Sequence, residues 1–192
     1  MCCWFRLSRR GTKLPVDASG ATVRQAAAVA AWTIVARERL LTTARRYHSV
    51  ITYKELAEEV QKASGVRTTQ RLDYWIGALL ENVAIDATRR GEPPITALCV
   101  HQDGTIGPGY ARAPKSVESD SNADVDQLAA EHRLLCYRAY AQDLPGDGGI
   151  AALTPQMAAS RARRQKAEAT PRPVCPVHFV ELSITGTCGS CE

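Results

Sequence analysis

Four residues near the end of the chain have the types and the spacing of metal ligands. Two residues separate Cys175 from His178, two separate Cys188 from Cys191, and nine lie between the pairs. Three thiolates and one imidazole complete the closed tetrahedral shell that zinc adopts in structural sites. We therefore predict one Zn²⁺ bound to Cys175, His178, Cys188 and Cys191.

This predicted zinc module covers residues 174–192 and resembles zinc-ribbon and zinc-knuckle tails. So short a segment has almost no apolar core, so the metal must supply much of its folding free energy. Two alternatives remain, which are thiols without a metal and a catalytic metal. Four protein ligands leave no open coordination position, which disfavours a catalytic metal.

Composition limits the class of protein. The chain has 192 residues and seven cysteines, three of them in the predicted zinc module. The N-terminus has too short an apolar run for a signal peptide, and no stretch approaches the ~20 apolar residues of a membrane span. These features predict a cytoplasmic protein with reduced thiols and no membrane partner. Arginine outnumbers lysine 19 to 5 beside 29 alanines, which is typical of a GC-rich bacterial genome.

Positive charge is concentrated in two segments. Residues 1–46 have 9 basic and 2 acidic side chains, and residues 154–173 have 5 basic and 1 acidic. Basic runs of this kind bind phosphate groups or form a solvated surface. We predict that the second segment contacts nucleic acid through the four basic side chains Arg161, Arg163, Arg164 and Lys166.

Hydrophobic periodicity predicts a mainly α-helical chain with one small hairpin. Helices are expected over residues 22–47, 53–64, 69–82, 124–142 and 154–169, with Trp32, Ala36 and Leu40 on one face of the first. Residues 82–90 either continue the third helix or form a short fourth one. Thr52 and Glu55 have the spacing of a capping box at the second of these. Residues 95–101 read as a strand, and Asp103-Gly104 as the tight turn of a hairpin.

Three helices followed by a hairpin is the order of a winged helix-turn-helix domain. The helix over 69–82 would be the recognition helix, and Gln70, Arg71 and Tyr74 near its start would contact DNA. The alternative is a generic helical domain with a solvated polar face. Asp73 and Glu81 lie on or near that face and favour the alternative.

The run Ile51-Thr-Tyr-Lys-Glu-Leu-Ala57 resembles the opening of the winged-helix domain in O6-alkylguanine alkyltransferases and alkyltransferase-like proteins. The segment from Asp103-Gly104 to Gly109-Tyr110 resembles the end of that domain. The resemblance implies a winged-helix fold that binds alkylated DNA. It does not extend to the Pro-Cys-His-Arg acceptor motif, which is absent. Cys99 and His101 would share a strand face, but a nucleophile also needs an orienting group, and none is identifiable. A buried apolar Cys99 is the expected alternative.

His132 and Cys136 lie four residues apart on one helix, where we expect core packing rather than a metal pair. The expected organisation is a disordered basic N-terminus (1–20), a winged-helix domain (21–142), a flexible basic connector (143–173) and the zinc module (174–192). We predict a non-enzymatic nucleic-acid-binding protein, with DNA preferred over RNA. The alternatives are a protein-interaction adaptor using both modules, and alkyltransferase-like lesion binding without alkyl transfer.

Overall fold

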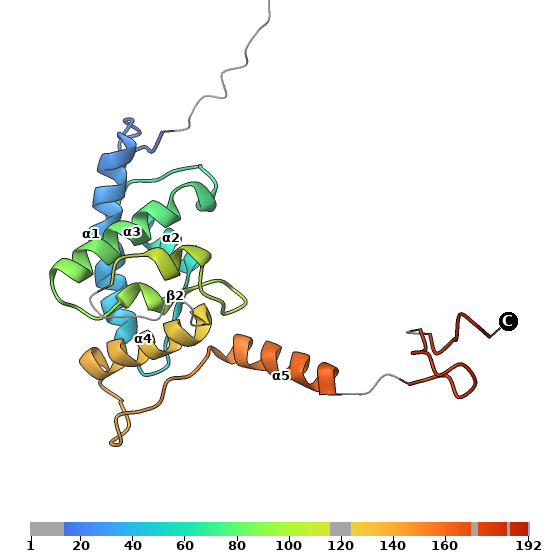
Figure 1. The fold of residues 1–192 in the computed structure, drawn as a ribbon. Coiled ribbons are helices and arrows are strands. Elements are labelled where there is room, and N and C mark those ends of the chain that lie inside the picture. Colours follow the sequence, from blue (N-terminus) through green and yellow to red (C-terminus); the bar gives the residue numbers. More distant parts are fainter. Residues whose placement is uncertain (1–13, 116–123, 170–172, 184, 192) are drawn as a thin grey trace, which may run out of the picture. The chain divides into compact units, whose positions relative to one another are not determined.

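The computed structural model describes residues 14–115, 124–169, 173–183 and 185–191 (Figure 1). The chain divides into two compact units, residues 1–154 and 155–192, each of which is treated separately. Among the described residues there are five α-helices and a parallel sheet of two short strands. None of the described helices combines the length and apolarity needed to cross a membrane.

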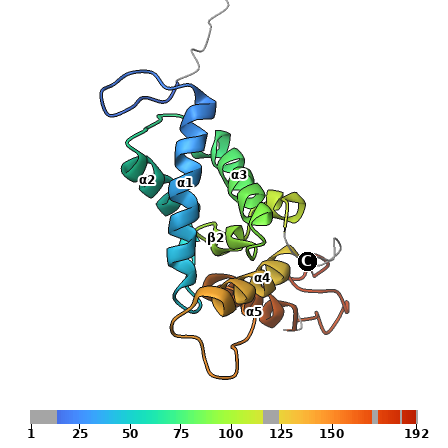
Figure 2. The same cartoon turned by 90° about the vertical axis from the view of Figure 1, so that its left-hand side faces the viewer.

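Helix α1 (Gln25–Ala44) is the centre of the first unit, with α2 and α3 packed against it (Figure 2). Its buried face carries Trp32, Ala36 and Leu40, the helical spacing that the sequence predicts. The indole N–H of Trp32 donates a 2.8 Å hydrogen bond to the carbonyl oxygen of Val66. This bond satisfies a polar group that burial would otherwise leave unpaired.

Helix α2 (Tyr53–Ser64) begins with the predicted capping box. The hydroxyl of Thr52 accepts from the backbone N–H of Glu55, and the Glu55 carboxylate accepts from the backbone N–H of Thr52. Gly65 ends the helix at a φ of +71°, a left-handed conformation in which a residue without Cβ is not strained. Strand β1 (Ile51–Thr52) leads directly into this helix.

The third predicted helix starts later than the sequence indicates. A 3₁₀ turn, η1 (Leu72–Tyr74), precedes α3 (Ile76–Arg89). The side chain of Gln61 accepts from the Thr68 N–H, and the Thr68 hydroxyl accepts from the Gln70 N–H. Such side-chain bonds compete with helix formation. The expected recognition helix over 69–82 is therefore wrong at its N-terminus.

The predicted hairpin wing is also wrong. Residues Ile95–Leu98 form a 3₁₀ turn (η2), and β2 (Cys99–Val100) pairs with β1 in parallel register, Ile51 opposite Cys99. The predicted tight turn is present, because the Gly104 N–H donates to the His101 carbonyl. The return strand is not: one backbone bond, from the His101 N–H to the Thr105 carbonyl, crosses the turn, and the next inward N–H, that of Gly107, donates to the hydroxyl of Tyr53 instead.

The rest of the first unit closes the core. A 3₁₀ turn, η3 (Pro108–Arg112), is followed by α4 (Val125–Tyr140), which Asp124 caps. His132 and Cys136 are buried on α4, as expected for core packing. The hydroxyl of Tyr110 lies 2.6 Å from Nδ1 of His132.

Two segments predicted to lack structure are held to this core. Val16, in the expected disordered N-terminus, exchanges two 2.8 Å backbone hydrogen bonds with Arg67. In the expected flexible connector, Ile150 bonds through both its N–H and its carbonyl to the hydroxyl of Tyr47. The first 13 residues, which include the Cys2-Cys3 pair, lie outside the described part of the chain.

The second unit begins with helix α5 (Pro155–Ala169), which has no buried residue. The segment that contains the predicted metal ligands follows from residue 173.

Candidate metal centre

A short hairpin positions the first pair of predicted ligands. Val174 and Glu181 form an antiparallel bridge, and the Cys175 N–H donates to the carbonyl of Val180. The chain reverses between them, where the Phe179 N–H donates to the Cys175 carbonyl over 2.9 Å. This turn brings the side chain of His178 back over the thiol of Cys175.

A second turn positions the other pair. The Ser183 N–H donates to the carbonyl of Thr187, and Gly186 between them has a φ of +77°. The Cys191 N–H then donates to the Cys188 carbonyl over 3.2 Å, which closes a tight loop with both thiols on one side. Glycine takes the left-handed conformation at position 186 without steric cost.

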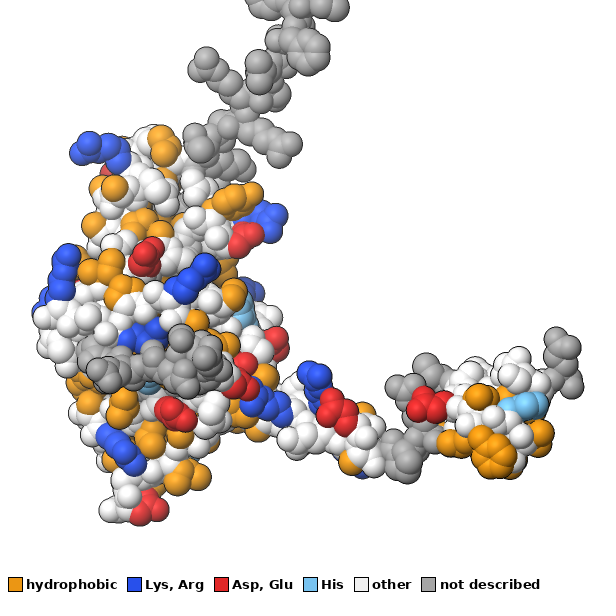
Figure 3. Space-filling model, in the orientation of Figure 1, with side chains coloured by type: hydrophobic (Ala, Val, Ile, Leu, Met, Phe, Trp, Pro, Cys, Tyr) orange, Lys and Arg blue, Asp and Glu red, His pale blue; other side chains and the backbone are white. Residues whose placement is uncertain are grey.

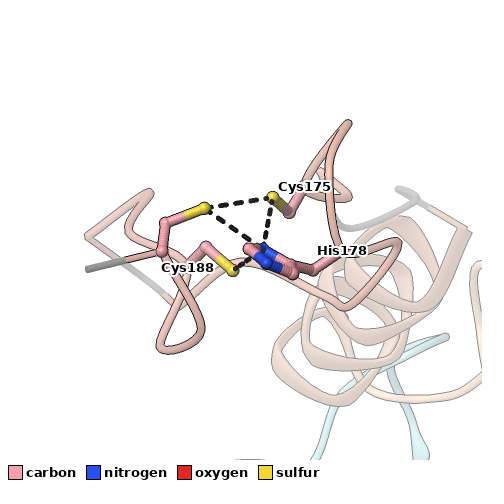
Figure 4. Close-up of side chains that lie close together, drawn as sticks. Cys175, His178 and Cys188 are labelled. Carbon is pink, nitrogen blue, oxygen red and sulfur yellow. Dashed lines mark hydrogen bonds between the residues drawn. The ribbon is translucent and has the colours of Figure 1, made fainter.

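The two turns bring all four predicted ligands together (Figure 4), with their ligand atoms within 4.8 Å of one another. The thiols of Cys175 and Cys191 are 3.6 Å apart. Nδ1 of His178 lies 3.8 Å from Cys175, 3.6 Å from Cys188 and 3.3 Å from Cys191. Tetrahedral zinc places neighbouring sulfurs about 3.8 Å apart, and sulfur and nitrogen about 3.6 Å apart. The cluster therefore has the dimensions of a closed zinc site.

The geometry also selects one nitrogen of the histidine. The three short distances from the thiols end on Nδ1 of His178. Nδ1 is therefore the nitrogen that would bind the metal and must be unprotonated, while Nε2 carries the proton. The sequence spacing indicates a histidine ligand but not which of its nitrogens is used.

Local hydrogen bonds prepare one thiol for a metal. The backbone N–H groups of His178 and Val177 stabilise the thiolate of Cys175 and lower its pKa to about 6. The neighbouring thiols of Cys175 and Cys188 raise the pKa of Cys191 to about 11. Thiolate is the form that binds zinc, so the lowered pKa of Cys175 favours metal binding at this residue.

The predicted nucleic-acid contacts lie on two different elements. Arg163, Arg164 and Lys166 are exposed on α5, and Arg161 is partly exposed there. Arg164 is paired with Glu168 at 2.9 Å, an exposed pair of little energetic value. Figure 3 shows both basic and acidic side chains on this helix.

The other three predicted contacts precede α3 instead of starting a helix. Gln70 and Arg71 lie in the loop, and Tyr74 in the 3₁₀ turn is 74% exposed. The guanidinium of Arg71 pairs with Asp73 at 2.7 Å, so a phosphate would have to compete with that carboxylate.

The Cys99–His101 pair does not form a nucleophile. Cys99 is fully buried, and burial raises the pKa of its thiol well above the usual range. The exposed ring of His101 packs edge-on against Tyr53, with the ring centroids 4.5 Å apart. A protonated thiol in the core is the arrangement of a packing cysteine.

A cleft of about 1480 Å³, which no sequence pattern indicates, lies between α3 and the loop over residues 101–113. Apolar side chains of Leu72, Ile76 and Leu80 line one wall. At its edge, the hydroxyl of Tyr53 accepts a 3.0 Å hydrogen bond from the Gly107 N–H. Burial raises the pKa of Tyr53 to about 12. The cleft lies where a return strand was expected, so the predicted hairpin gave no indication of it.

No protein-family model, no curated protein and no solved structure matches this chain. The resemblance to the alkyltransferase winged helix therefore has no support beyond the residues quoted for it. What is established is a mainly helical domain and a Cys₃His cluster suited to a metal ion such as zinc.

Proposed function

We propose that this chain is a non-enzymatic nucleic-acid-binding protein, with DNA as the preferred partner and one structural Zn²⁺. The observation that carries the proposal is α5, a basic helix of 15 residues that buries none of its side chains. Helices in proteins are normally stabilised by packing an apolar face. A basic helix without a buried apolar face is explained when phosphate groups bind along it.

The distribution of charge around α5 supports nucleic acid over a membrane surface. At 3.6 residues per turn, the basic side chains from Lys166 round to Arg161 cover about 220° of the circumference. A membrane-bound helix needs a broad apolar face, and Met157 is the only large apolar residue of α5. A helix in a DNA groove has phosphates on both sides, which fits a wide basic arc.

The zinc site is proposed to be structural. Its four ligands leave no position for a water or a substrate, so the metal stabilises a fold and performs no reaction. Among the described residues of the zinc module, Cys175 is the only one that is buried. The metal therefore replaces a hydrophobic core.

Fluorescence anisotropy with a short labelled duplex of mixed sequence tests the proposal. Each phosphate contact contributes about −0.9 to the slope of log affinity against log salt. Replacing Arg161, Arg163, Arg164 and Lys166 by glutamine should therefore weaken binding and reduce the magnitude of the slope by about 3.6. Single-stranded DNA and RNA of the same sequence show which nucleic acid is preferred.

The matched control removes basic charge elsewhere. Arg89 and Arg90 are exposed at the end of α3, and their replacement by glutamine should change the slope by less than about 1. Absence of duplex binding at low salt refutes the proposal. Equal losses for each charge removed in the control and α5 variants show that net charge, rather than α5, determines binding.

A second candidate function is recognition of alkylated guanine without alkyl transfer. The cleft favours it, because Tyr53 of the alkyltransferase-like run and residues 107–110 of the second matching segment line the same cavity. Duplexes with one O6-methylguanine or one guanine at the same position provide the test. Tighter binding of the methylated duplex that is lost in Tyr53→Ala supports this function, and equal affinities exclude it.

A further inference from the structure

The zinc module exposes large apolar side chains at a density that the helical unit does not have. Val174, Val177, Phe179 and Val180 are 51%, 68%, 81% and 44% exposed. All four belong to the hairpin over residues 174–181: Val174 forms its bridge with Glu181, Val180 precedes that bridge partner, and Val177 and Phe179 lie in the connecting turn. Orange side chains gather on this module in Figure 3. Four exposed apolar side chains within eight residues of one hairpin indicate an interaction site. We refer to these four residues as the valine–phenylalanine patch.

Phe179 has an unusual backbone conformation that displays its ring. Its φ is +54°, a left-handed value that bulky residues rarely adopt. The Phe179 N–H is bonded to the Cys175 carbonyl, so the turn that aligns the metal ligands also imposes this conformation. Asparagine or glycine would fit such a position with less strain. The large apolar side chain present there is explained by contact with a partner.

Charge restricts what that partner can be. Residues 173–192 contain no lysine or arginine. Zn²⁺ with three thiolates and a neutral imidazole has one net negative charge, and Glu181 adds a carboxylate. This surface repels phosphate, so neither nucleic acid nor an anionic membrane is its occupant. Two copies meeting patch to patch would bring like charges together.

We propose that the valine–phenylalanine patch docks a protein segment in which apolar residues are flanked by lysine or arginine. Phe179 and Val177 supply the apolar contact at the tip of the hairpin. As zinc ligands, the partly exposed Cys188 and the exposed Cys191 are thiolates, which together with the carboxylate of Glu181 complement the cationic flanks. This inference rests on the zinc site but is independent of the nucleic-acid contacts of α5.

The test is a selection of random short peptides displayed on phage against the zinc-loaded full chain, with nuclease present. The key variant is Phe179→Asn, because asparagine tolerates the left-handed backbone while it removes the ring. Ile150→Asn is the matched control, since Ile150 is 69% exposed in the helical unit. Zinc content and affinity for duplex DNA are measured for each variant.

We expect enrichment of peptides that combine apolar residues with lysine or arginine. Their affinity should fall at least about tenfold in Phe179→Asn, as for a central aromatic contact, and stay unchanged in Ile150→Asn. Zinc content and DNA affinity should be the same in both variants. The inference is overturned if no peptide is enriched, if acidic peptides are enriched, or if Phe179→Asn binds as the wild type does. Concentration-dependent dimerisation that Phe179→Asn abolishes overturns it in favour of a second copy. A chain that binds these peptides but not DNA refutes only the function proposed for α5 and leaves the peptide-binding inference supported.

Discussion

Replacing two alanines in the middle of α5 by glycine should weaken DNA binding without any change in charge. Ala159 and Ala162 lie inside the helix Pro155–Ala169, which has no buried residue to hold it. An isolated helix of this length is only marginally stable in water, so DNA binding must supply much of the free energy that stabilises it. Glycine costs about 1 kcal/mol relative to alanine at each interior position.

The two substitutions together cost about 2 kcal/mol of helix formation. If α5 becomes helical on the DNA, this cost appears in the binding free energy as a loss of about 30-fold in affinity. The slope of log affinity against log salt should stay the same, because every basic side chain remains. Ala169→Gly is the matched control, since the last position of a helix is frayed and its substitution should cost less than about twofold.

Fluorescence anisotropy measures the affinities, and circular dichroism with and without DNA measures the gain in helix. Wild-type affinity in the double glycine variant, with no gain in helix on binding, refutes the reasoning. That result would show that the basic residues bind as an irregular chain and that the helical arrangement of their charges is irrelevant.

Three further predictions concern the two units separately. A zinc chelator should remove the dispersed amide NMR signals of residues 173–191 and leave the melting temperature of the helical unit unchanged; a lower melting temperature would contradict the separation of the units. Burial lowers the pKa of His132 below its ordinary value of about 6.5, so the unfolded chain binds more protons at this residue than the folded chain does. The free energy of unfolding, measured with urea, should therefore fall as the pH drops below about 6.5, by at most about 1.4 kcal/mol per pH unit. The variant His132→Gln should lack this contribution, and an unchanged pH dependence would show that other groups cause it. A Cβ at position 107 would lie 2.5 Å from the hydroxyl oxygen of Tyr53, so Gly107→Ala should lower the melting temperature. Adding Tyr53→Phe to this variant should recover part of the loss. Additive losses would show that the clash is not with that hydroxyl.

Local signals in the sequence were sufficient for several elements. The capping box at Thr52 and Glu55 needs only residues three apart, and it is present. The spacing of Trp32, Ala36 and Leu40 identified the buried face of α1. The metal ligands were identified for the same reason, because each pair is formed within a turn of four residues.

Elements that depend on distant partners were not predictable in this way. The start of α3 is delayed by a bond from the Thr68 N–H to the side chain of Gln61 on another helix. The expected wing does not continue past its turn, because the N–H of Gly107 bonds to the hydroxyl of Tyr53, 54 residues earlier in the chain. Strand β2 instead pairs with β1 in parallel, and its partner Ile51 lies 48 residues before Cys99. No pattern within one segment indicates such a partner.

The cleft was missed for a related reason. Its walls come from α2, α3 and the loop over residues 101–113, which only the folded chain brings together. At its edge, a Cβ at position 107 would meet the Tyr53 hydroxyl, but a glycine in the sequence does not by itself indicate such a contact. The cleft depends on how distant segments pack against one another, and hydrophobic periodicity within one segment does not indicate this packing.

X-ray absorption spectroscopy at the zinc edge of the purified full chain is the decisive test of the metal centre. We expect one zinc per chain, bound by three sulfurs at about 2.3 Å and one nitrogen at about 2.0 Å. Cys188→Ser should lose one sulfur from this shell or lose the metal. A chain without zinc, a shell with oxygen ligands, or a wild-type spectrum in Cys188→Ser would refute the Cys₃His zinc site.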